Sequence, residues 1–247
     1  MTKEEEVFKE AIMDQEAQTA RELLCARVND ALNDYGLKLF AAGNAFGGGP
    51  AKAQDSDLKD LLERMIGLSC VVQIAGELGV ACVNLLKTNQ FYASFSLVRQ
   101  IVECEYLCWA FAEDQDEARK WLNTTRAERR SFWSPKHMRD RSRGEFRDKD
   151  YAVHCEFGGH PTPRALALLH ASRSMHENAI WLELTVHLSN VWSHTTRAIP
   201  EEILPLLDRK PGPQGKFSDV IVAVNEWQSS DPAHEARSQG PDFPTLK

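Results

Sequence analysis

The fold is decided by one long apolar stretch, residues 65–86, which reads MIGLSCVVQIAGELGVACVNLL. It carries a single charged side chain, Glu77, and is nearly long enough to span a bilayer. Gln73, Asn84 and three glycines interrupt it, and an unpaired carboxylate is unfavourable inside a membrane. We therefore expect this stretch to be a buried helix in the core of a globular protein.

Helical patterns continue on both sides of this stretch. Residues 94–111, SFSLVRQIVECEYLCWAF, are mostly apolar, with polar residues recurring on one helical face. The first forty residues place apolar side chains such as Leu24, Val28 and Leu32 at helical spacing. The sequence lacks strand-like alternation and internal repeats. It therefore predicts an all-α protein, an irregular multi-helix bundle.

Four successive regions are predicted. Residues 1–42 form N-terminal amphipathic helices, and residues 43–57 form a flexible glycine-rich loop that ends in Asp and Ser candidates for a helix N-cap. Residues 58–228 form the helical core domain, with a turn at HCEFGGHPTP and a long helix from Arg164 to about Arg197, stopped before Pro200. Residues 229–247 have few apolar side chains and are expected to be a flexible C-terminal tail.

Composition indicates an ordinary globular protein. Of the 247 residues, 43% are hydrophobic and 26% charged, a balance far from that of disordered chains. The acidic start MTKEEEVFKE does not resemble a secretory signal, so a cytoplasmic location is expected. The six cysteines lie in apolar helical surroundings and are predicted to be buried free thiols.

Positive charge is concentrated in residues 119–149, where eleven basic residues accompany four acidic ones in a chain of formal net charge −7. The overall charge disfavours a protein that coats nucleic acid, but a local basic surface is compatible with it. With Phe132 and Trp133, the arginines offer phosphate contacts and stacking faces for RNA or another polyanion. The alternative is a solvated, ion-paired face. The candidate nucleic-acid-binding residues are Arg126, Arg129, Arg130, Arg139, Arg141, Arg143 and Arg147.

A second set of polar residues is a candidate catalytic site. Arg99 and Glu103 share one face of an apolar helix, where charges need partners, and a structural ion pair is the alternative interpretation. The glycine-rich turn adds Tyr151, His154 and His160, which can exchange protons or bind anions. Whether the turn meets the Arg99 helix is left open by the sequence.

A polar stripe runs along the long helix predicted after Arg164. At 100° per residue, His176, Glu183, His187 and His194 fall near one line, and the sequence predicts that this line faces solvent. If another helix covers it instead, Glu183 and His187 can act as an acid–base pair or as ligands. No cofactor is predicted, and no metal site either, because the spacing of His154, Cys155 and His160 matches no standard zinc pattern. Walker, dinucleotide-binding, nucleophile-elbow and HExxH motifs are absent from the sequence.

Three short motifs resemble an uncharacterised bacterial family of all-helical domains. They are Arg99-x3-Glu103, Tyr151-x3-Cys155 and the pair His160-Pro161, within residues 60–195. The resemblance implies an all-helical fold with a polar site and names no reaction.

The chain also resembles helical toxin and defence proteins of the HEPN class, whose signature is an arginine followed at a short distance by a histidine. Arg164 to His170, Arg130 to His137 and Arg147 to His154 have this form. The resemblance implies a metal-free endoribonuclease.

Two hypotheses of function follow, and whether the protein is an enzyme is left open. The first is a cytoplasmic protein that binds RNA or another polyanion, with metal-free cleavage assisted by histidine and arginine. The alternative is a non-catalytic module that binds a protein partner in a bacterial defence or toxin–antitoxin complex. A small-ligand pocket around Arg99 and Glu103 is a third possibility.

Overall fold

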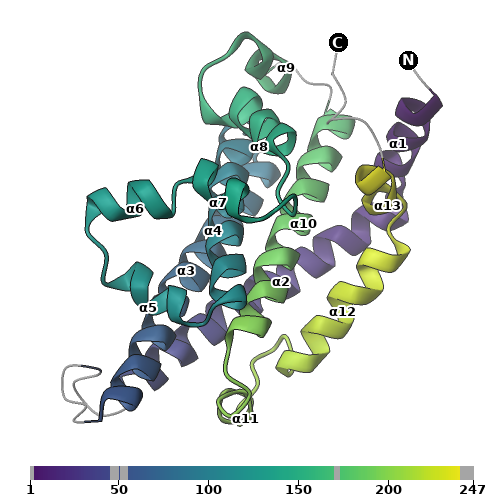
Figure 1. The fold of residues 1–247 in the computed structure, drawn as a ribbon. Coiled ribbons are helices and arrows are strands. Elements are labelled where there is room, and N and C mark those ends of the chain that lie inside the picture. Colours follow the sequence, from purple (N-terminus) through teal and green to yellow (C-terminus); the bar gives the residue numbers. More distant parts are fainter. Residues whose placement is uncertain (1–2, 45–49, 51–54, 170–172, 240–247) are drawn as a thin grey trace.

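The computed structural model describes residues 3–44, 50, 55–169 and 173–239. They form an all-α protein, 83% helical with 13 α-helices packed together, as the sequence predicts. Four long helices build the core, and α10 lies among the other three (Figure 1). They are α2 (Gln15–Gly43), α3 (Ser56–Lys87), α4 (Phe91–Glu113) and α10 (Arg173–Ala198).

Shorter helices surround this bundle. α1, α12 and α13 pack beside α2 and α10, whereas α7, α8, η2 and α9 lie along α4 (Figure 1). α5 packs mainly on α3. Their bounds are α1 Lys3–Met13, α5 Asp116–Leu122, α6 Arg126–Phe132, α7 Pro135–Arg141, α8 Asp148–His154, the π-helix η2 Cys155–Gly159, the 3-10 helix η3 Pro163–Ala165, α9 Leu166–Leu169, α11 Leu204–Leu207, α12 Phe217–Ser230 and α13 Pro232–Gln239.

The apolar stretch that the sequence places in the core lies in α3. The carboxylate of Asp55 caps this helix by accepting hydrogen bonds from the amides of Asp57 and Leu58, at 2.8 and 3.2 Å. Gly79 lets α3 approach α2 closely, because a Cβ there would lie 2.0 Å from Oδ1 of Asn29. By length and composition α3 could cross a membrane, and half of its most apolar window is buried in the molecule.

Other predictions concern the loop and the thiols. The predicted glycine-rich loop, 43–57, lies mostly outside the described residues, and its first residue, Gly43, still belongs to α2. All six cysteines are free thiols, and four of them are buried.

The predicted C-terminal tail, 229–247, is described up to residue 239 and is helical there except at Asp231, which corrects the expectation of a flexible segment for residues 229–239. Asp231 starts α13 by accepting hydrogen bonds from the amides of Ala233 and His234, at 2.9 and 3.1 Å. Its carboxylate also binds the buried guanidinium of Arg21 in α2, with Nε 2.7 Å from Oδ2. A buried ion pair therefore anchors this segment, although it has few apolar side chains.

Candidate metal centre

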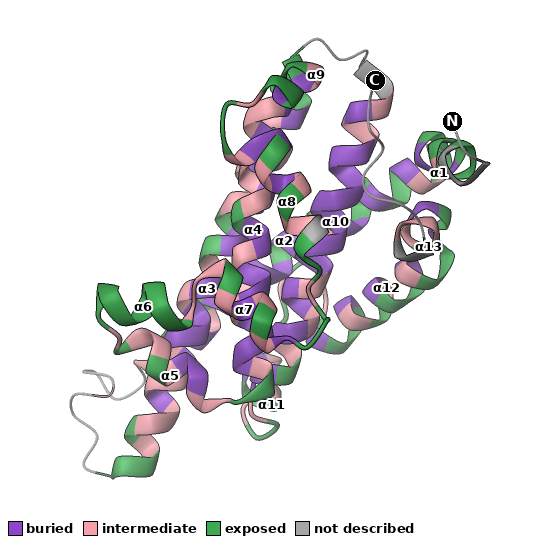
Figure 2. Cartoon of the chain, turned by 45° about the horizontal axis from the view of Figure 1, so that its top comes forward, coloured by how far each residue is buried: buried purple, intermediate pink, exposed green. Residues whose placement is uncertain are grey.

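The polar stripe of α10 is buried, which corrects the prediction that it faces solvent. His176, Glu183, His187 and His194 are all less than a tenth exposed. Figure 2 shows α10 buried along most of its length. The stripe is covered because α4, α8 and α13 pack over that side of α10, so its charges must be satisfied inside the protein.

α8 carries one of the covering histidines. On its outer side, the Tyr151 hydroxyl accepts a hydrogen bond from Arg99 and donates one to Glu103, both at 3.0 Å. Beyond the helix, Gly158 lies against α4 so closely that a Cβ would be 2.8 Å from the Phe95 carbonyl. These contacts hold the segment on α4 while His154 points inward and stacks on the Phe95 ring, with centroids 5.3 Å apart.

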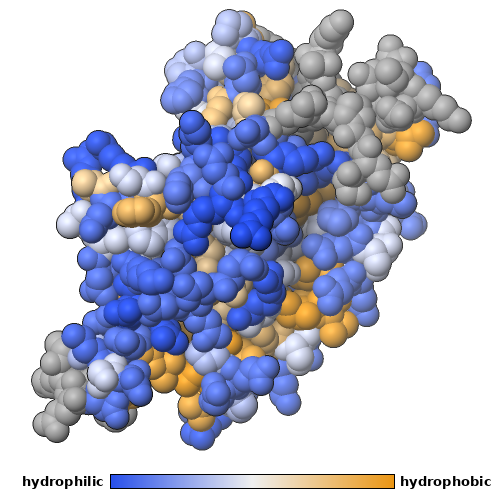
Figure 3. All heavy atoms as spheres, in the orientation of Figure 1, coloured by the Kyte–Doolittle hydropathy of each residue, from blue (hydrophilic) through white to orange (hydrophobic). Residues whose placement is uncertain are grey.

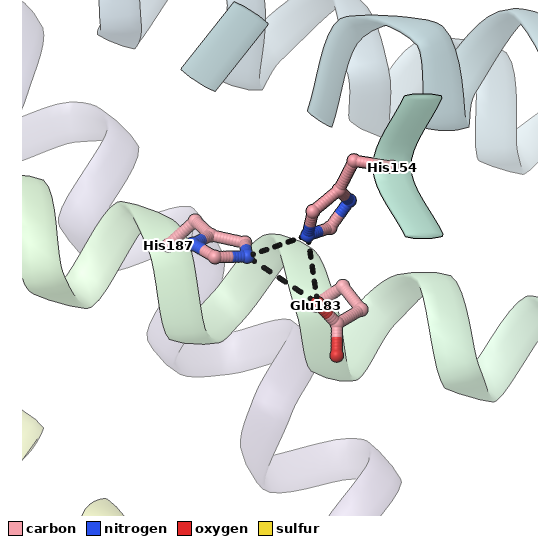
Figure 4. A group of neighbouring side chains, drawn as sticks. All are labelled: His154, Glu183 and His187. Carbon is pink, nitrogen blue, oxygen red and sulfur yellow. Dashed lines mark hydrogen bonds and ion pairs between the residues drawn. The ribbon is translucent and has the colours of Figure 1, made fainter. Parts of the chain in front are cut away.

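Three donor atoms converge inside the protein (Figure 4). The Nε2 atoms of His154 and His187 lie 3.1 Å apart, and each lies 3.3 Å from Oε2 of Glu183. The side chains of all three residues are at most 8% exposed. The cluster therefore joins α8 to α10 through two imidazoles and one carboxylate.

A second layer of polar groups orients these donors. Nδ1 of His187 donates to Oε2 of Glu105 at 2.5 Å, and Oε1 of Glu105 accepts from the amide of Asn190 at 3.0 Å. The guanidinium of Arg237 in α13 donates to both oxygens of Glu183, at 2.7 and 3.1 Å. With its Nδ1 proton held by Glu105, His187 can present an Nε2 lone pair to the cluster.

Without a bound cation, the cluster is a buried network of alternating charge. Burial disfavours charge on Glu183, but Arg237 and the two histidines outweigh it and hold the pKa of Glu183 well below its usual value. Burial likewise opposes protonation of His187, but the adjacent Glu105 carboxylate raises its pKa to about 9. Burial lowers the pKa of His154. In this state His187 is the charged imidazole and His154 the neutral one.

The donor separations match those of ligands around one ion. Zinc–nitrogen bonds of about 2.0–2.1 Å at tetrahedral angles place two ligand atoms about 3.3–3.4 Å apart. The three separations in the cluster are 3.1, 3.3 and 3.3 Å. Nδ1 of His154 is buried without a hydrogen-bond partner among the described residues, so protein contacts alone leave this histidine incompletely satisfied. The two imidazoles and the carboxylate suit a first-row divalent transition metal.

The predicted catalytic residues lie in three separate parts of the structure. Arg99, Glu103 and Tyr151 meet at the surface of α4 and α8, so the glycine-rich turn does approach the Arg99 helix. His154 is 1% exposed and belongs to the buried cluster instead. His160 is exposed at the end of the π-helix.

The predicted nucleic-acid-binding arginines also divide. Three of them form ion pairs: Arg139 with Asp148 at 2.6 Å, Arg141 with Glu117 at 2.9 Å and Arg147 with Asp150 at 3.0 Å. The others are exposed, namely Arg126, Arg129, Arg130 and Arg143. Of the arginine–histidine pairs of the HEPN class, Arg164 to His170 ends on a residue outside those that the structure describes.

Glu105 and Arg237 were not predicted to belong to any site, and Glu183 and His187 were predicted to act together only if another helix covers the stripe. Glu183 and His187 could be predicted because they lie on the same face of one helix. Glu105 and Arg237 carry no comparable signal, because they lie 82 residues from His187 and 54 residues from Glu183 along the chain.

Comparison with known protein families, with curated proteins and with solved structures finds no match to this chain.

Proposed function

We propose that the protein binds a first-row divalent transition metal, with zinc as the reference ion, through His154, Glu183 and His187. The observation that carries the proposal is the convergence of three donor atoms at separations of 3.1–3.3 Å. The hydrogen bond from Nδ1 of His187 to Glu105 adds the carboxylate–histidine pairing that accompanies metal-binding histidines. These contacts support one ion held between α8 and α10.

The composition of the ligand set favours a catalytic type of site. Structural zinc sites use four protein ligands, whereas catalytic sites keep two histidines and a glutamate, or similar sets, and leave a position for water or substrate. A bound zinc ion would lower the pKa of such a water. Glu105, held by Asn190, then orients His187, and Arg237 balances the charge of Glu183.

The metal-free ribonuclease hypothesis has less support from the geometry. It requires a histidine beside an arginine where a polymer can reach both. His154 is buried between α8 and α10, while Arg99 is held by Tyr151 and Glu103 at the surface. The interaction-module hypothesis remains a separate proposal, for which pull-down with the purified protein is the test.

The direct test is metal stoichiometry. Purified full-length protein, stripped with a chelator and titrated with zinc in competition with a chromophoric chelator, is expected to bind about one ion per chain. His154→Gln removes one imidazole ligand and should weaken binding by more than about 10-fold, because a second-layer change alone costs that much. His160→Gln is the matched control at an exposed position and should bind zinc like the unchanged protein. Equal loss in both variants, or no binding to the unchanged protein, would refute the proposal.

The second layer gives an independent prediction. Glu105→Gln keeps the shape of the side chain but replaces the carboxylate that accepts from Nδ1 of His187. Loss of such a partner lowers metal affinity by about 10- to 100-fold. The competition titration measures this loss, and circular dichroism checks that the variant is folded. Unchanged zinc affinity in a folded Glu105→Gln protein would show that Glu105 does not orient the ligand.

A further inference from the structure

Helix α6 lies on the surface and contributes no side chain to the hydrophobic core. None of its residues is buried, and it stands away from the bundle in Figures 1 and 2. Its start is fixed by a capping box, in which Thr125 and Glu128 exchange hydrogen bonds between side chain and backbone. A helix of seven residues is marginally stable by itself in water, so the adjoining segments must hold it in place. All seven of its side chains face solvent.

The charges on this helix are largely unneutralised. Arg126 and Arg130 are exposed and have no acidic partner at ion-pair distance among the described residues. Arg129 donates a hydrogen bond to the carbonyl of Thr124, which leaves its charge in place. Figure 3 shows mainly hydrophilic residues over α5, α6 and α7. A local positive surface therefore exists on a chain whose formal net charge is −7.

Aromatic rings and a groove lie beside these charges. Phe132, the last residue of α6, is 52% exposed, and its ring centroid is 5.9 Å from that of Trp133. Both rings line an open groove of about 430 Å³ together with Lys120, Asn123 and Arg141.

The two carboxylates of the groove are already engaged. Glu117 binds Arg141 at 2.9 Å, and Glu128 accepts from the amide of Thr125 at 2.8 Å. The two cations of the groove are paired as well, Lys120 with Asp114 at 3.0 Å and with Glu117 at 3.5 Å, and Arg141 with Glu117. The groove therefore supplies the exposed ring of Phe132, and the positive charge beside it that is unpaired among the described residues belongs to Arg126 and Arg130 on α6.

We infer that this face, formed by α6, Phe132, Trp133 and the groove, binds single-stranded nucleic acid with little sequence preference. Arg126, Arg129 and Arg130 would contact backbone phosphates, and Phe132 would stack on a base. The exposed ring favours an unpaired strand over an acidic protein, because every base offers a π-face and a duplex hides its bases. The inference does not depend on the proposed metal site.

The test measures fluorescence anisotropy of a labelled 20-nucleotide RNA with full-length protein in EDTA across a KCl series. EDTA keeps any metal out, so failure here is distinguishable from failure of the metal proposal. Binding is expected to weaken with salt, and Arg126→Ser with Arg130→Ser should flatten the log–log salt slope by about 1.4, since each phosphate contact on a single strand contributes about 0.7. Phe132→Ser should weaken binding roughly 5- to 150-fold, the loss of one stacked base.

The matched control removes two exposed charges elsewhere, Arg209→Ser with Lys210→Ser, and should leave the salt slope unchanged. Three results would overturn the inference. They are no binding in low salt, equal weakening by the control pair, and binding of duplex RNA or of poly-glutamate as tight as that of the single strand. Of these, tight binding of poly-glutamate would assign the face to an acidic protein partner instead.

Discussion

Replacing Arg21 with methionine is expected to lower the free energy of unfolding by about 3–5 kcal/mol, because it leaves the Asp231 carboxylate buried without its counter-ion. The side chains of the pair are 0% and 1% exposed. Arg21 also donates to the carbonyls of Ala11 and Ile12, at 3.1 and 3.2 Å. The pair therefore ties the end of α1 and the start of α13 to α2.

This loss is a large part of the stability of an ordinary domain, about 5–15 kcal/mol. For a chain of this size it corresponds to a Tm lower by roughly 6–20 °C, measurable by calorimetry. Arg27→Met is the matched control in the same helix. It removes one hydrogen bond, from Nε to the Gln214 carbonyl at 3.0 Å, and should cost only about 1 kcal/mol. Equal Tm values for the two variants would contradict the prediction.

The pH dependence of the pair has a definite sign. Burial disfavours the charged form of Asp231, but Arg21 outweighs it and lowers the pKa of this carboxyl below its usual value. The stability from ionised Asp231 is thus fully present above about pH 4 and is lost as pH falls through the folded-state pKa. Asp231→Asn removes this contribution. Its stability deficit relative to the unchanged protein should be constant near neutrality and shrink in acid.

The fold followed from local patterns. Helical spacing of apolar residues and the Asp55 cap predicted the long helices, because these signals lie within a few residues of the structure they specify. The C-terminal helix α13 was not predicted. The ion pair that holds it in place joins Arg21 and Asp231, which are 210 residues apart in the sequence. Nothing in the composition of residues 229–239 indicates a partner at that distance.

The candidate metal centre could be predicted only in part from the sequence. The 3.6-residue period placed Glu183 and His187 on one line, but a period cannot tell whether solvent or another helix covers that line. Polar lines on helices usually face water, and this one is buried because Glu105 and Arg237 supply opposite charges from α4 and α13. Conversely, Arg99 and Glu103 were predicted to share a helix face and do form an ion pair, because four residues make one helical turn. Their contact with Tyr151, which the sequence left open, comes from the packing of α8 on α4.

Arg237→Met is expected to lower the free energy of unfolding of the metal-free protein by about 3–5 kcal/mol, because the buried carboxylate of Glu183 loses both hydrogen bonds from the guanidinium. Arg197→Met is the matched control. Its pair with Glu113, at 2.6 Å, is about half exposed and should contribute less than about 1 kcal/mol.

The same variant links stability to the proposed metal site. A divalent cation bound by Glu183 would replace the missing positive charge and would no longer be repelled by a guanidinium on the same carboxylate. Zinc should therefore bind more tightly to Arg237→Met and raise its Tm by more than it raises that of the unchanged protein. Calorimetry with and without excess zinc measures both quantities. If Arg237→Met is destabilised but binds zinc more weakly, Arg237 orients Glu183 for the metal. If Arg237→Met is as stable as Arg197→Met, the Glu183–Arg237 pair contributes little to folding.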